Sequence, residues 1–133
     1  MQGEETTRKK EEPMKIAITS TGDTKSSKAD PRFGRARYFL IFDTATSEYE
    51  VIDNTINMEA PQGAGIQAAE TVVDQGAKIL ITGHCGPKAF RVLQGAGIVV
   101  YTGASATVEE ELDRFIKGEL IEAKGPDVDG HWA

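Results

Sequence analysis

The sequence has little cysteine and no long apolar segment. Its 133 residues include one cysteine, Cys85, which excludes an internal disulfide framework and a four-cysteine metal site within one chain. No apolar run approaches the roughly 20 residues that cross a bilayer, and no hydrophobic signal-peptide region opens the chain. The remaining composition, 39% apolar and 27% charged, suits a globular protein, and a cytoplasmic location is expected.

An overall positive charge is also missing. Lys+Arg 15 against Asp+Glu 21 gives a formal net charge of −6, which argues against partners such as nucleic acid or an anionic membrane. The balance differs between residues 25 and 37, where Asp30 is the one acidic residue and five are basic: Lys25, Lys28, Arg32, Arg35 and Arg37. Such a cluster is most often a solvated loop, and the sharper interpretation is an anion site on an otherwise acidic molecule.

A single domain is expected over residues 14–122, because two independent cores would each be small for their surface. Residues 1–13 contain no large apolar side chain beyond Met1 and are predicted to form a disordered tail. Residues 123–133 are rich in glycine, proline and aspartate and are predicted to form a second flexible tail, although Trp132 could fold back onto the domain.

Within the domain, short apolar runs alternate with longer amphipathic segments. Strands are expected at residues 15–20, 38–42, 49–52, 79–81 and 98–101, and helices at 65–74, 87–94 and 108–117. The first helix is expected to bury Ile66, Ala69 and Val73. The second helix has Pro87 at its first position and Gly95 just past its end, which is the usual asymmetry of helix termini.

The last helix carries the firmest local signals. Thr107 and Glu110 form a predicted capping box, and Gly118 is expected to end the helix. Its apolar face is predicted from residues at positions i, i+4, i+7 and i+8: Val108, Leu112, Phe115 and Ile116.

This order of elements predicts an α/β fold. Alternation in the second half implies right-handed crossovers and parallel strands. The economical arrangement is a three-layer, ribonuclease-H-like fold, with helices on both faces of a five-stranded mixed sheet. Its strand order is 3-2-1-4-5, and strand 2 is antiparallel.

Such a sheet places its ligands beyond the carboxyl ends of its strands. Three strands end in threonine followed by glycine, at positions 21–22, 82–83 and 102–103. The basic loop and the segments 61–65 and 83–87 leave strands at this edge. The edge is therefore expected to gather glycines, positive charge, a histidine and the only thiol.

Taken singly, the motifs at this edge are weak. The Gly63-Ala-Gly65 segment matches part of a dinucleotide fingerprint but does not follow the first strand, and no P-loop is present. A metal-dependent nuclease of this fold needs a carboxylate on its first strand, and residues 15–20 contain none. Asp43 and Asp53 are predicted to serve turns.

The segment Gly83-His84-Cys85-Gly86-Pro87 is the most informative of these. Its glycines allow a close backbone approach, and its amides open a helix whose dipole favours an anion. A thiol at a helix N-terminus tends toward the thiolate, which binds metals. In the alternative interpretation Cys85 packs as a small apolar residue and His84 is a surface or capping group, and both interpretations stay open.

Several of these segments occur together in a known family. The ordered set of Asp30-Pro-Arg-Phe-Gly-Arg-Ala36, Gly63-Ala-Gly65, Ile81-Thr-Gly-His-Cys-Gly-Pro87 and Gly97-Ile-Val-Val-Tyr101 resembles the dinitrogenase iron–molybdenum cofactor biosynthesis family, which includes NifX, NafY and the C-terminal domain of NifB. The resemblance covers about residues 14–121.

The resemblance implies a non-enzymatic carrier that binds an anionic metal–sulfur cluster, containing iron or molybdenum, and passes it between donor and acceptor proteins. It also implies the binding residues Arg32, Phe33, Gly34, Arg35, Gly63, Gly65, Gly83, His84, Cys85 and Gly86. Cys85 and His84 would be the metal ligands, because arginines, amides and one or two soft ligands suit a polyanionic cluster. A monomer or a weak homodimer is expected.

Two other functions remain open. One is a small enzyme with Cys85 as nucleophile, and the other is a regulatory module that binds a protein through the sheet edge or the Trp132 segment. The carrier hypothesis requires Cys85 to be accessible and Arg32 and Arg35 to lie near it.

Overall fold

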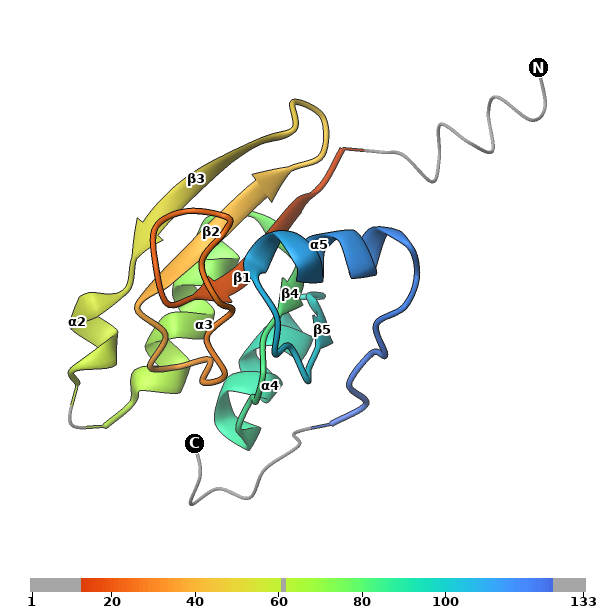
Figure 1. The fold of residues 1–133 in the computed structure, drawn as a ribbon. Coiled ribbons are helices and arrows are strands. Elements are labelled where there is room, and N and C mark those ends of the chain that lie inside the picture. Colours follow the sequence, from red (N-terminus) through yellow and green to blue (C-terminus); the bar gives the residue numbers. More distant parts are fainter. Residues whose placement is uncertain (1–12, 61, 126–133) are drawn as a thin grey trace.

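The computed structural model describes residues 13–60 and 62–125, and five of its strands form one mixed sheet (Figure 1). The strands are β1 Lys15–Ser20, β2 Tyr38–Asp43, β3 Glu48–Asp53, β4 Ala77–Ile81 and β5 Val99–Tyr101. Their order is β3-β2-β1-β4-β5, with β2 antiparallel to β1 and β3, and β4 parallel to β1 and β5. The predicted α/β fold and its strand order are confirmed.

Helices cover both faces of this sheet (Figure 1). The helices are α2 Thr55–Met58, α3 Ala64–Asp74, α4 Pro87–Gly95 and α5 Val108–Ile116. α3 and α4 pack on the face that carries Ala17, Phe39 and Leu80, whereas α5 packs on the opposite face. Because side chains alternate between the two faces of a strand, each strand contributes to both cores.

α2 was not predicted from the sequence. It is a single turn of four residues with none buried, so it has no apolar periodicity that a sequence pattern would reveal. Asp53 lies two residues before its first residue, and the Asp53 carboxylate accepts hydrogen bonds from the backbone N–H and the hydroxyl of Thr55. These bonds, led by that from the hydroxyl, lower the pKa of Asp53. The predicted turn roles of Asp53 and of Asp43, which accepts from the N–H of Ala45, are confirmed.

The buried face of α3 differs from the predicted one. Its buried residues are Ala64, Ala68, Ala69 and Val72. Ile66 and Val73, which were expected in the core, are only partly buried. Three of the four buried residues are alanines, which let α3 lie close to the sheet and to α4, so the larger side chains fall on its flanks.

α5 begins with the predicted capping box, in which Thr107 and Glu110 exchange hydrogen bonds. Its apolar face was predicted incorrectly at one end, because the Ile116 side chain is 69% exposed. Glu111 is buried instead. Its Oε2 accepts hydrogen bonds from the N–H groups of Ser105 and Ala106, so a carboxylate fixes the loop before the helix.

The end of α4 also shifts slightly from the predicted position. Pro87 occupies the first turn as expected, but Gly95 is the last helical residue rather than the one beyond it. Gly97 provides the left-handed conformation that ends the turn, with φ 80°. No helix in the described ranges is long and apolar enough to cross a membrane.

The two edges of the sheet differ. At the outer edge of β5, Ala123 N–H donates to the carbonyl of Val100 at 2.8 Å, and Glu122 forms a bridge with Tyr101. The chain thus contacts the sheet one residue past the predicted boundary at 122. β3 forms the other edge and has no further strand beside it in the described part of the chain. The remaining tail predictions, for residues 1–12 and for 126–133 with Trp132, fall outside the described residues.

Candidate functional site

Three segments that are distant in sequence meet at the carboxyl edge of the sheet: residues 31–34, 63–65 and 83–86, which together we call the cradle. The first and third are joined through their backbones. His84 N–H donates to the carbonyl of Pro31 at 2.7 Å, and Phe33 N–H donates to the carbonyl of His84 at 3.2 Å. A Cβ atom added at Gly83 would lie 2.5 Å from Pro31 Cα, so only glycine permits this approach.

The first and second segments are equally close. A Cβ at Gly34 would lie 2.8 Å from both the nitrogen and Cα of Gly65, at the start of α3. Gly63 precedes that helix with φ 79°, in the left-handed region that favours glycine. The structure therefore brings together the glycines that sequence analysis assigned to this edge.

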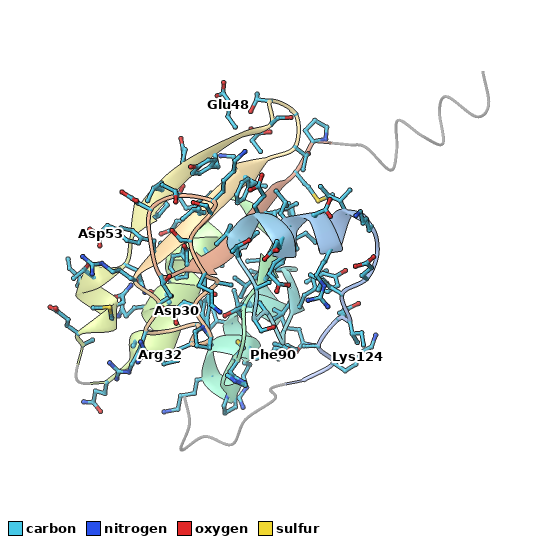
Figure 2. All side chains as sticks on the ribbon, in the orientation of Figure 1. Asp30, Arg32, Glu48, Asp53, Phe90 and Lys124 are labelled. Carbon is cyan, nitrogen blue, oxygen red and sulfur yellow. The ribbon has the colours of Figure 1, made fainter. Side chains whose placement is uncertain are left out.

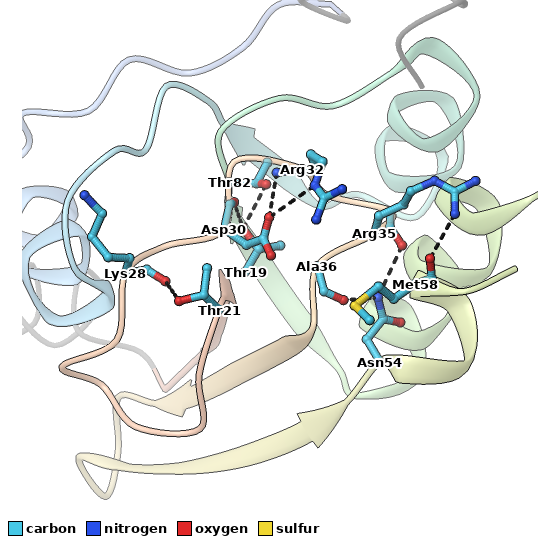
Figure 3. A network of polar contacts seen from close by, with 11 residues as sticks. Thr19, Thr21, Lys28, Asp30, Arg32, Arg35, Ala36, Asn54, Met58 and Thr82 are labelled. Carbon is cyan, nitrogen blue, oxygen red and sulfur yellow. Dashed lines mark hydrogen bonds and ion pairs between the residues drawn. The ribbon is translucent and has the colours of Figure 1, made fainter.

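A buried polar network holds the cradle against the strand ends (Figure 3). The Thr19 hydroxyl at the end of β1 lies 2.8 Å from the carbonyl oxygen of Asp30 and 2.9 Å from the Thr82 hydroxyl beyond β4. The Asp30 carboxylate accepts a hydrogen bond from Arg32 N–H at 3.0 Å. These polar groups satisfy one another, so the loop has a defined path rather than a solvated, variable one.

Arg32 and His84 have exposed polar side chains in the cradle. Their backbones lie opposite each other in an isolated parallel β-bridge. The Arg32 side chain is 62% exposed, and its Nε lies 3.8 Å from Asp30 Oδ1, which orients the guanidinium. An arginine beside a histidine and backbone amides forms a surface suited to an anion.

The other basic residues of the loop do not join Arg32 in one patch. Lys25 pairs with Glu109 on α5 at 3.7 Å, and the Arg37 guanidinium lies 5.6 Å from the ring centre of Tyr38. Arg35 donates from Nη1 to the carbonyls of Met58 and Ala60, at 2.9 Å each, and so holds the end of α2 (Figure 3). The expected cluster of positive charge is therefore dispersed, because most of these side chains serve local structure.

Two predicted binding residues lie in the core. Phe33 is 2% exposed and packs on Phe39, with ring centres 5.6 Å apart. Cys85 is 1% exposed, and its thiol lies 3.8 Å from the carbonyl oxygen of Gly86. The expectation that Cys85 is an accessible soft donor is wrong, and the alternative interpretation, a small apolar residue in the core, describes its position. Within the described ranges, no group of three or more His, Cys, Asp and Glu side chains could hold a metal ion.

Asn54 is a residue of this region that sequence analysis missed. It is 2% exposed and donates from Nδ2 to the carbonyls of Ala36 and Gly34, at 2.7 and 3.3 Å. Its own N–H donates to the carbonyl of Arg37. From sequence, an asparagine directly after a strand is predicted to be a turn residue. The sequence therefore carries no signal that Asn54 anchors the loop around residues 34–37.

Known proteins resemble this chain over most of its length. The apo form of the orange protein from Desulfovibrio gigas is 41% identical with a TM-score of 0.84, covering 86% of this chain and 97% of that one. A Thermotoga protein provisionally assigned as NifB is 38% identical with a TM-score of 0.73, covering 82% and 92%. An uncharacterized protein of Methanocaldococcus jannaschii is 30% identical over 80% of this chain and 89% of its own.

The family profile described as dinitrogenase iron-molybdenum cofactor matches residues 14–118. This range includes the five strands and four helices of the described residues and every segment of the cradle. The resemblance found in the sequence is thereby confirmed, and the chain belongs to the dinitrogenase iron–molybdenum cofactor family.

Proposed function

We propose that this protein binds an anionic metal–sulfur cluster, of the iron–molybdenum cofactor kind or a precursor, at the cradle. It holds the cluster for handover from a donor protein to an acceptor protein and does not catalyse turnover. The observation that carries this proposal is the backbone β-bridge that sets Arg32 opposite His84, at an edge where three loops are in backbone contact. Membership of the iron–molybdenum cofactor family supports the class of ligand.

Helix termini add to the anion preference of this edge. α3 and α4 both begin at the cradle, after Gly63 and Gly86, and neither has a side-chain cap. The first N–H groups of a helix have no partner within the helix and carry partial positive charge, so they favour an anion nearby. Arg32 adds a positive side chain at the same edge, where its backbone lies opposite His84, two residues before Gly86.

The buried Cys85 does not meet the requirement that the carrier hypothesis set from the sequence, so the proposed binding mode does without the thiol. Thiolate capture is not part of it, so the cluster is held by the Arg32 charge, by hydrogen bonds from backbone amides, and by His84 as the accessible ligand. Contacts of this kind exchange more readily than several metal–thiolate bonds. A carrier needs such exchange, because a tightly captured cluster could not be delivered. Burial also removes Cys85 as the accessible nucleophile that the alternative enzyme function required.

The experiment is anaerobic loading of the metal-free protein. The full chain is incubated with tetrathiomolybdate, or in a separate sample with ferrous iron and sulfide, then desalted, and the visible absorption retained by the protein is measured. Arg32→Ala and His84→Ala should each lower the retained absorption about threefold to tenfold, as loss of one charge-assisted contact predicts. Cys85→Ala should retain it.

Arg37→Ala is the matched control, because it removes the same charge from the same loop at a side chain that lies over Tyr38. It should load like the unmodified protein. Equal loading of the Arg32→Ala and His84→Ala variants, with circular dichroism showing that both are folded, would remove the cradle as the binding site.

A further inference from the structure

A second concave surface lies at the other end of the sheet, and nothing in the proposed function uses it. It is an open groove of about 600 Å³ between α5 and the tip of the β2–β3 hairpin. Its apolar floor consists of Phe42, Tyr49, Leu112 and Ile116. The Phe42 and Tyr49 rings lie against each other with centres 5.1 Å apart, and because Phe42 is buried, the accessible ring of the pair is that of the half-buried Tyr49.

The groove exists because this face of the sheet has fewer helices than the other. α3 and α4 cover one face, whereas α5 is the one helix of the described residues on the face that carries Leu40 and Phe42, where the loop containing Ala29 also packs (Figure 1). Apolar area over the hairpin is left in contact with water. Ile116 is 69% exposed and Val51, which is paired with Leu40 across the sheet, is 40% exposed.

The rim of the groove is acidic. Asp43 and Glu48 line it from the hairpin and Glu109 lines it from α5, against one lysine, Lys25. Three carboxylates and one ammonium give a local charge of −2, and Lys25 is already paired with Glu109. A bound segment with positive charges beside its apolar side chains would match this rim, whereas a second copy of this chain would oppose carboxylates to carboxylates.

We propose that this groove is a docking site for an amphipathic helix of a partner protein, whose apolar stripe is flanked by lysine or arginine. The helix lies beside α5 over the hairpin, buries Tyr49, Leu112 and Ile116, and completes the second helical layer. This is the helix-in-groove mode of recognition, in which apolar side chains anchor the helix and rim charges select it.

The position of the groove leaves the cradle open during docking. In the β1–β2 register, the backbone of Asp43 lies opposite that of Lys15, so the groove is near the start of β1. The cradle, in contrast, follows the ends of β1 and β4. Glu48 of the rim and Arg32 of the cradle accordingly lie at opposite ends of the molecule (Figure 2). A partner held at the groove would not cover Arg32 or His84. The proposal does not depend on what the cradle binds.

The test uses the full chain and a designed, fluorescently labelled helical peptide of about 15 residues, with leucines on one face and lysines beside them. Affinity is measured by fluorescence anisotropy, and the site is mapped by chemical-shift changes of the 15N-labelled protein. Shifts should concentrate at Tyr49, Leu112 and Ile116. Ile116→Asp and Glu48→Lys should each weaken binding at least fivefold, and a peptide with glutamate in place of lysine should bind more weakly still.

Ile56→Asp is the matched control variant, because Ile56 is 87% exposed on α2, away from the groove. Binding should be unchanged by it, and because both isoleucines are exposed, both variants should fold. Shifts centred on the cradle, or equal losses in Ile116→Asp and Ile56→Asp, would overturn the proposal. So would a concentration-dependent dimer in analytical ultracentrifugation that Ile116→Asp abolishes, because a second copy would then be the occupant.

Discussion

The two ends of the sheet are built in different ways. At the carboxyl end, backbone meets backbone: Gly34 lies against Gly65, Gly83 lies against Pro31, and buried hydroxyls tie the loops to the strands. At the amino end, side chains form the surface, with aromatic rings and aliphatic groups on the floor of the groove and carboxylates on its rim. The exposed charge is positive at Arg32 and negative around the groove.

This contrast shows how one small domain can present two independent surfaces. Backbone contacts fix the shape of the cradle with little dependence on side-chain size, provided that the glycines remain. The groove depends on the volume and polarity of its side chains, which substitutions change gradually. Changes at one end should therefore leave the other intact, and the variants below test that independence.

The largest effect is expected at the amino end, from Phe42→Ala. Phe42 is 6% exposed and packs on Tyr49, so its truncation removes buried apolar area and leaves a cavity. The free energy of unfolding should fall by about 3–4 kcal/mol, measured by urea denaturation. Ile116→Ala, in the same groove but exposed, should change it by less than about 0.5 kcal/mol. Equal costs for the two would mean that the floor is not packed as described.

A smaller loss is expected at the carboxyl end, from Gly83→Ala. The added methyl group would lie 2.5 Å from Pro31 Cα, so residues 31–34 must move, and we expect a cost of about 2–3 kcal/mol in the same measurement. Gly95→Ala is the control, because a Cβ there meets nothing within 4 Å at the end of α4. It should be neutral or stabilise by up to about 1 kcal/mol. Peptide binding at the groove should survive both changes.

The smallest effect is expected from Thr107→Ala, which removes the hydroxyl of the capping box that starts α5, the helix that forms one wall of the groove. The expected cost is about 1 kcal/mol near neutral pH. Hydrogen bonds from the Thr107 backbone N–H, and then from its hydroxyl, lower the pKa of Glu110 below its ordinary value of 4.5.

The pH dependence follows from that direction. A carboxylate with a lowered pKa stabilises the folded state above its ordinary pKa, and this contribution is lost as the pH falls through the lowered value. The difference between the unmodified protein and Thr107→Ala should therefore be smaller at pH 3 than at pH 7. Urea denaturation at the two pH values measures it, and a difference that grows in acid would contradict the capping box.

Sequence reasoning succeeded where local pattern decides structure. The strand order followed from alternating elements and right-handed crossovers, and the Thr107–Glu110 box gave the start of α5. The meeting of the glycine segments followed from the rule that parallel strands place their carboxyl ends at one edge. These inferences need only chain order and element type.

It failed where the outcome depends on which way a side chain points. The basic loop could not reveal that Arg35 binds the end of α2, because α2 itself has no sequence pattern. Cys85 lies one residue from an exposed histidine, and only the path of the chain into α4 turns its thiol into the core. Glu111 is buried because two backbone N–H groups of the preceding loop donate to its carboxylate. A pattern of polar and apolar residues predicts instead that a glutamate faces solvent.

The unequal edges of the sheet have a consequence for self-association. Residues 122 and 123 occupy the β5 side, so among residues 13–60 and 62–125 the sheet edge left open to strand addition is β3. If two copies paired through their β3 strands, the open edge of each copy would be covered. The assembly would then stop at a dimer instead of growing into a fibre. Even that pair is discouraged, because Glu48, Glu50 and Asp53 would bring like charges together along the seam.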